Sequence, residues 1–119
     1  MIAYAMAKTS YSGDMVRSNK KVILTVPGTE IADAVMGCGM TTGRDTDKAA
    51  KFNIELIPVE GSTIQIPAHS RVAIVCTLKE YHEVGDHYLY ICNVDQVYGE
   101  ESEEALFAWN GYAQLRPAK

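Results

Sequence analysis

Apolar and polar residues follow different periods in the two halves of this chain. In the second half, two β-rich runs at 71–82 and 87–98 flank Val84-Gly85-Asp86, which predicts two antiparallel strands joined by a hairpin turn. Because side chains alternate across a strand, four residues of the second run are expected to share one face: Tyr88, Tyr90, Cys92 and Val94. Residues 100–104 indicate a solvated acidic loop, and a closing hairpin is predicted around Asn110-Gly111.

The first half contains shorter elements, beginning with a helix and a strand. Residues 12–20 predict a short helix with Ser12 as its N-cap and Asp14 in its first turn. The apolar run at 22–26 is stopped by Pro27-Gly28 and is expected to form a strand that is buried on both faces, or nearly so.

Two further helices are predicted between this strand and the long hairpin. Residues 29–38 place four side chains along one stripe of a helix: Ile31, Ala34, Val35 and Cys38. Gly39 is expected to end that helix in a left-handed conformation, and residues 45–52 predict another short helix with Asp45 as its N-cap. Helices first and antiparallel strands later indicate an α+β domain whose sheet curls into a barrel.

Composition and charge narrow the class of protein. The chain has 119 residues, which is enough for one domain, and its net charge of −4 with scattered basic residues argues against a nucleic-acid partner. No apolar run is long enough to cross a membrane, and the first residues lack the pattern of a signal peptide. The three cysteines show no CxxC spacing, so we expect reduced thiols in a cytoplasmic protein.

Two motifs that would indicate other chemistry are incomplete. Residues 37–42 begin like a dinucleotide-binding fingerprint, but Thr42 replaces the third glycine and the segment follows a predicted helix. His82 and His87 flank the hairpin turn, and we interpret them as polar turn residues, so no metal ligand is assigned.

Charged and hydroxyl side chains gather at two other places. Lys8-Thr9-Ser10-Tyr11-Ser12 lies just before a predicted helix start, where backbone N–H groups and the helix dipole favour an anion such as phosphate. A plain N-cap beside a surface lysine is the alternative interpretation of the same pattern. Residues 43–48 carry four charges in six positions and by themselves indicate a solvated helix start.

Taken together and in order, four stretches resemble the flavin-reductase-like family, which includes flavoredoxin. Residues 8–12 are similar to the family segment that contacts the flavin phosphate, and residues 22–28 to the strand that ends in Asn-Val-Pro, with Thr25 in place of asparagine. Residues 38–52 are similar to the Ser-Gly-Arg-Asp-x-Asp-Lys segment, and residues 83–91 to the Gly-Asp-His hairpin that precedes a long barrel strand. The resemblance spans essentially the whole chain.

The resemblance implies an α+β fold of the FMN-binding split-barrel type and a single domain over residues 1–119. Family members usually carry further strands before the point that corresponds to Met1, so the domain is expected to lack the usual first strands. Relatives are homodimers with the flavin ring between subunits, which implies a homodimer here. An edge left open by missing strands would also favour pairing with another chain.

The resemblance further implies a flavoprotein of the flavin reductase type, which transfers a hydride between NAD(P)H and FMN. The residues implied to bind FMN are Lys8, Thr9, Ser10, Tyr11, Ser12 and Arg44. His87 is implied on the nicotinamide side. Two alternatives stay open: a flavin-binding electron carrier that serves a redox protein partner without NAD(P)H turnover, and a shortened dimerisation domain that no longer binds flavin.

Overall fold

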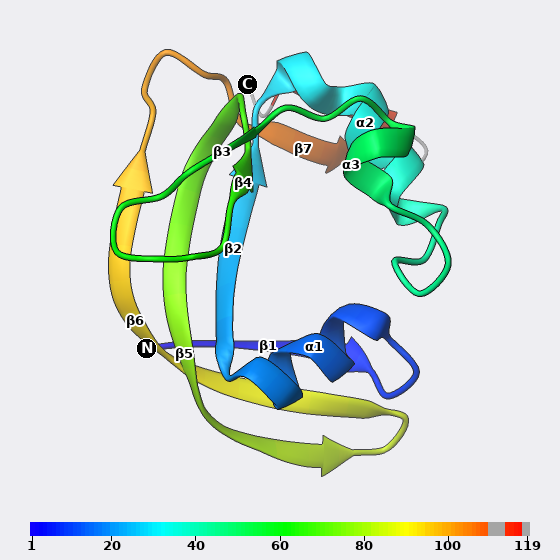
Figure 1. The fold of residues 1–119 in the computed structure, drawn as a ribbon, viewed down its shortest axis with the longest axis vertical. Coiled ribbons are helices and arrows are strands. Elements are labelled where there is room, and N and C mark those ends of the chain that lie inside the picture. Colours follow the sequence, from blue (N-terminus) through cyan, green and yellow to red (C-terminus); the bar gives the residue numbers. More distant parts are fainter. Residues whose placement is uncertain (110–113, 118–119) are drawn as a thin grey trace. The chain divides into compact units, whose positions relative to one another are not determined.

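The computed structural model describes residues 1–109 and 114–117 (Figure 1). Its first elements are a strand, a helix, a second strand, a short 3₁₀ helix and two α-helices: β1 (Ile2–Ala7), α1 (Tyr11–Asn19), β2 (Lys21–Pro27), η1 (Thr29–Ile31), α2 (Ala32–Gly39) and α3 (Lys48–Lys51). Only strands follow in the described residues: β3 (Leu56–Ile57), β4 (Ile66–Pro67), β5 (Ser70–Val84), β6 (His87–Gly99), β7 (Leu106–Trp109) and β8 (Gln114–Pro117). None of the described helices is long and apolar enough to cross a bilayer.

Four strands form the main sheet, in the order β1-β6-β5-β2. Strand β1 runs antiparallel to β6, and its register pairs Ile2 with Cys92 and Ala7 with His87. Two small antiparallel pairs, β3–β4 and β7–β8, complete the described strands. The chain divides into two compact units, residues 1–24 with 74–97 and residues 25–73 with 98–119, so that β2, β5 and β6 each contribute to both.

The first unit has a core between α1 and the sheet. Tyr90, Cys92 and Cys76 are fully buried, and Val16 of α1 and Leu78 pack against them. The predicted face of β6 is confirmed, because its four residues all belong to this cluster or pack against it. The long hairpin is also confirmed, and its strands extend to Ser70 and Gly99.

In the second unit, the predicted stripe of the helix at 29–38 is confirmed and lines a cavity. Its four residues face a space of about 280 Å³, whose other walls come from β2, β4, the start of β5 and Ile54 after α3. Helix α2 also packs closely against Phe52, since a methyl group at Gly37 would lie 2.5 Å from Cε1 of that ring.

The structure corrects several local predictions. Residues 29–38 form η1 and then α2, and the cap at Met40 has φ −100°, so Gly39 does not end the helix in a left-handed conformation. Helix α3 begins at Lys48 because the Asp47 carboxylate, not that of Asp45, accepts a hydrogen bond from the amide of Ala50 (3.2 Å). The apolar residues of β2 are only half-buried.

Two predictions near the C-terminus have different outcomes. The loop at 100–104 is mostly exposed, but the Glu103 side chain is only 14% exposed, so this residue departs from the predicted solvated loop. The strands of the closing hairpin are confirmed as β7 and β8, whereas the Asn110-Gly111 turn lies outside the described residues.

Two glycines of α2 provide a matched test of its packing. Gly37→Ala forces the Phe52 ring to move. In Gly39→Ala, the added methyl group has no atom within 4 Å, and alanine has a higher helix propensity than glycine. We expect Gly37→Ala to be less stable than Gly39→Ala by about 1–3 kcal/mol, the usual cost of overpacking. Urea unfolding measures the difference, and equal stabilities would contradict the described packing of α2 on Phe52.

The cysteines should differ in reactivity. Burial raises the pKa of the Cys76 and Cys92 thiols, which lowers their thiolate fraction at mildly alkaline pH, whereas Cys38 is partly exposed. Reaction of the native protein with Ellman's reagent should therefore show one fast and two slow thiols. Cys38→Ser should remove the fast phase, and three equally fast thiols would contradict the buried core.

Candidate functional site

The start of helix α1 is built by a tight turn and a serine cap. The amide of Ser10 donates to the carbonyl of Ala7 (3.0 Å), which closes a turn over Lys8 and Thr9. Ser10 is extended, and its Oγ accepts a hydrogen bond from the amide of Gly13 (3.2 Å). The N-cap is therefore Ser10, and the prediction of Ser12 is wrong: Ser12 already lies in the first helical turn and is exposed.

The β5–β6 hairpin holds the same turn from the other side. The amide of Lys8 donates to the carbonyl of Asp86 (3.0 Å), and the Lys8 ammonium pairs with the Glu83 carboxylate at 2.9 Å. Since Ala7 also pairs with His87 in the β1–β6 register, the structure brings the segment 8–12 and His87 together within the first unit. These residues are 75 or more positions apart in the sequence, and the β1–β6 pairing is what brings them close.

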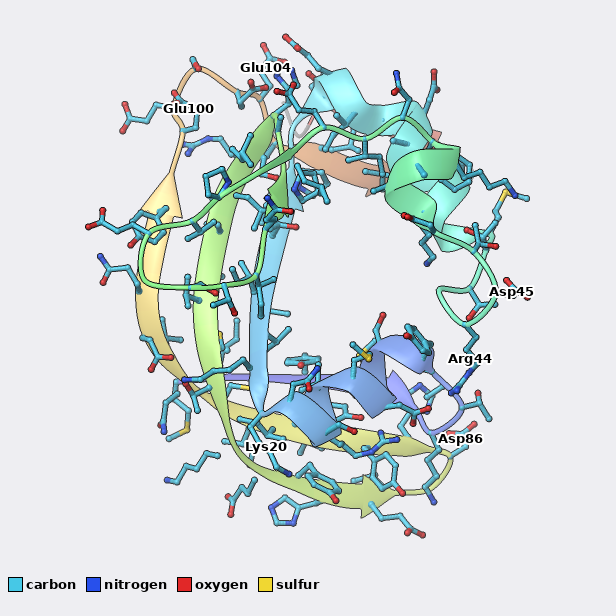
Figure 2. All side chains as sticks on the ribbon, in the orientation of Figure 1. Lys20, Arg44, Asp45, Asp86, Glu100 and Glu104 are labelled. Atoms are coloured by element: carbon cyan, nitrogen blue, oxygen red, sulfur yellow. The ribbon has the colours of Figure 1, made fainter. Side chains whose placement is uncertain are left out.

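The tip of the hairpin carries an exposed pair of titratable groups. Nδ1 of His87 lies 2.7 Å from Oδ1 of Asp86, and the hydrogen bond with His87 lowers the pKa of the Asp86 carboxyl. The His87 side chain is half-exposed and Asp86 almost fully so, as its outward direction in Figure 2 shows. His87 is therefore accessible to a ligand and has a carboxylate partner in Asp86.

Helix α1 is fixed to the sheet by contacts that the sequence did not reveal. Nη1 of Arg17 donates to the hydroxyl of Tyr90 (2.6 Å), and its guanidinium lies 4.5 Å from the ring centroid of Tyr88 and pairs with Asp14. A methyl group at Gly13 would lie 2.8 Å from the same Tyr90 hydroxyl. A glycine three positions after a serine cap is a usable signal for such close packing, but Arg17 has no comparable signature in the sequence.

The other charged residues singled out in the sequence come from other segments of the chain. Arg44 belongs to the second unit, in the exposed loop between α2 and α3, where its amide donates to Oγ1 of Thr42 (3.3 Å; Figure 2). Within that charged segment, the Lys48 ammonium donates to the carbonyl of Cys38 at the end of α2 (2.9 Å). His82 lies 3.6 Å from the carboxylate of Glu80, so His82 and His87 have separate acidic partners.

Replacing the two serines separately tests which one caps α1. Ser10→Ala removes the side-chain acceptor of the Gly13 amide and should cost about 1 kcal/mol of stability. Ser12→Ala is the matched control and should change the free energy of unfolding by less than about 0.5 kcal/mol, as is usual at exposed positions. Chemical denaturation measures both values, and a larger loss for Ser12→Ala would reverse the assignment.

Comparison with solved structures identifies the fold. The flavoredoxin of Methanosarcina acetivorans is similar with a TM-score of 0.82 at 15% identity, over 98% of this chain and 68% of that one. An NADH:FAD oxidoreductase of Streptomyces globisporus is similar with a TM-score of 0.81 at 14% identity, over 98% of this chain and 68% of that one. An FMN-binding protein of Thermus thermophilus is similar with a TM-score of 0.76 at 19% identity, over 98% of this chain and 64% of that one. The α+β split-barrel fold expected from the sequence is thus confirmed.

These matches also define how much of a typical relative the chain represents. It spans 64–68% of the length of these three solved proteins. No curated protein sequence matches the chain. The sequence model of the flavin reductase like domain, in contrast, matches residues 1–116. The chain therefore belongs to the flavin-reductase-like family.

Proposed function

We propose that this chain is an FMN-binding oxidoreductase of the flavin reductase type, and that the turn at Lys8–Ser10 with the start of α1 binds the FMN phosphate. The observation that carries the proposal is the geometry of this segment: a capped helix start directly after a turn that presents one ammonium group. Helix starts of this kind favour phosphate because their first N–H groups have no acceptor within the helix.

The donors of the segment fit a phosphate group. The ammonium of Lys8 supplies a positive charge, and the exposed Ser12 adds a hydroxyl in the first helical turn. Ser10 has a different role, because its Oγ is used by the Gly13 amide, so it shapes the site instead of donating. Thr9 and Tyr11 belong to the same proposed site by their place in the turn and at the first helical position.

Glu83 sets the electrostatic condition for binding. Its carboxylate pairs with the Lys8 ammonium at 2.9 Å and is itself 69% exposed. A phosphate would therefore compete with the Glu83 carboxylate for Lys8. Breaking this pair costs little free energy, since exposed ion pairs contribute at most about 1 kcal/mol. Lys8 is already held near the helix start by its backbone bond to Asp86.

The remaining roles follow from the position of the hairpin. Bound FMN would supply the acceptor for a hydride, and NAD(P)H would be the donor. His87, half-exposed at the hairpin and beside Asp86, would donate a hydrogen bond to the nicotinamide side. We also propose that Arg44 contacts flavin or the dinucleotide, and that the active form is a cytoplasmic homodimer.

Titration with FMN and with riboflavin tests the phosphate site directly. Lys8→Ala should weaken FMN binding by about ten-fold or more, because one charge-assisted hydrogen bond is worth roughly 1.5–3 kcal/mol. Riboflavin lacks the phosphate, so its affinity should change little. Quenching of flavin fluorescence measures both affinities.

Two further variants sharpen this titration. Lys79→Ala removes an exposed lysine of β5 in the same unit and should leave FMN affinity unchanged. Glu83→Gln removes the carboxylate that competes for Lys8 and should tighten FMN binding. Equal losses for Lys8→Ala and Lys79→Ala, or equal effects on FMN and riboflavin, would contradict the phosphate site.

Oxidation of NAD(P)H with FMN present separates the candidate functions. Turnover supports the reductase, and FMN binding without turnover supports an electron carrier that serves a protein partner. His87→Ala should reduce turnover while leaving FMN affinity nearly unchanged. Wild-type protein that binds no FMN would contradict the proposal and leave a dimerisation domain as the function.

A further inference from the structure

Three potential metal ligands from distant parts of the sequence meet in the second unit. They are Glu30 in η1, His69 in the turn between β4 and β5, and Glu103 in the loop after β6. Nδ1 of His69 lies 2.9 Å from Oε1 of Glu103 and 3.0 Å from Oε2 of Glu30. The three ligand atoms all lie within 4.8 Å of one another. None of these residues takes part in the proposed phosphate site.

Backbone contacts hold the three segments together. The amide of Gly28 donates to the carbonyl of His69 (2.7 Å), and the amide of Thr29 donates to the carbonyl of Glu104 (3.0 Å). Gly28 also forms a β-bridge with Ala105. The segments that carry the three ligands are thus connected by main-chain hydrogen bonds, independently of the side chains themselves.

Gly28 allows the close approach of these segments. A methyl group there would collide with the carbonyl oxygen of His69 and lie 2.8 Å from Oε2 of Glu103. The Glu103 side chain is consequently confined, with 14% of it exposed, whereas Glu30 is 64% exposed and forms the solvent side of the cluster. The site is largely enclosed on its inner side, at Glu103, and open to water on its outer side, at Glu30.

We propose that Glu30, His69 and Glu103 bind one divalent transition-metal ion of the Zn²⁺ class. Imidazole nitrogen with carboxylate oxygen is a donor set that Zn²⁺ and its neighbours accept, whereas Mg²⁺ and Ca²⁺ prefer oxygen alone. In a tetrahedral site with bonds of about 2.0–2.1 Å, ligand atoms lie roughly 3.3 Å apart. The distances from Nδ1 of His69 to the carboxylate oxygens of Glu30 and Glu103 need to increase by only a few tenths of an ångström to reach that value.

The ion would connect three segments of the second unit. Water would complete its coordination on the exposed side, next to Glu30. Because the ion would bind the folded unit and not the unfolded chain, its main effect would be on stability, which should rise with the free metal concentration.

The test uses the full chain without an affinity tag, after treatment with a chelator. Zn²⁺ is titrated by calorimetry, and Co²⁺ by its visible absorption, which reports tetrahedral coordination. We expect one ion per chain with micromolar or tighter affinity, and a melting temperature that rises with Zn²⁺. Failure of the wild-type chain to bind either ion saturably would overturn the proposal.

Matched variants connect the binding to these three residues. His69 has φ +66°, a conformation that asparagine adopts more readily than most residues, so His69→Asn removes the imidazole while keeping the backbone. Glu30→Gln changes only an exposed side chain and tests the site should His69→Asn fold poorly. Each substitution should lower the affinity for Zn²⁺ by more than about ten-fold. Losses of about ten-fold are already typical for residues that only hydrogen-bond to the metal ligands, and removing a ligand should cost more.

Two control variants address the other possible ligands of Zn²⁺. His82→Asn removes an exposed histidine of the first unit, and Cys38→Ser removes the partly exposed thiol. Both should bind Zn²⁺ as the wild type does and keep the metal-dependent rise in melting temperature. Zn²⁺ binding that survives Glu30→Gln and His69→Asn, or is lost in Cys38→Ser, would assign the ion to another place. Because FMN titration depends on Lys8, its outcome does not affect this test.

Discussion

The contact between helix α1 and the fully buried Tyr90 is the constraint on which the first unit depends. A buried hydroxyl without a hydrogen-bond partner destabilises the fold, and Tyr90 finds its partner in the guanidinium of Arg17. Gly13 lets the helix backbone approach the same hydroxyl, where a larger residue would push the helix away. Both contacts fix the depth and rotation of α1, and they therefore fix where its N-terminus lies.

The position of that N-terminus gives the proposed phosphate site its shape. The turn before α1 is closed by the Ser10 amide, and its outer side is bonded to the β5–β6 hairpin at Asp86. Backbone bonds at both ends leave the Lys8 side chain as the adjustable part, with Glu83 as its present partner. A site of this kind binds an anion by exchanging one solvated carboxylate for another negative group, so a modest difference in free energy decides its occupancy.

The second unit is held together by different means. Helix α2 packs through the small surface of Gly37 against Phe52, and the ammonium of Lys48 satisfies a carbonyl at its end. Around Gly28, main-chain hydrogen bonds and a β-bridge connect three segments of the chain. His69 and Glu103 lie at that junction, so an ion bound by them would connect the same segments.

The sequence by itself determined the elements whose signals are local and repeated. Period-two alternation in β6 and helical spacing across η1 and α2 each involve four residues, so an error at one position does not change the result. The four motifs at 8–12, 22–28, 38–52 and 83–91, taken in order, likewise indicated the family, which the match over residues 1–116 confirms. Tertiary structure decided the helix caps, because Ser10 and Ser12, or Asp45 and Asp47, are chemically equivalent until the backbone places one of them next to a free amide. It alone decided the cluster at His69, whose partner Glu103 lies 34 residues away, since no local pattern records which distant loops a fold brings together.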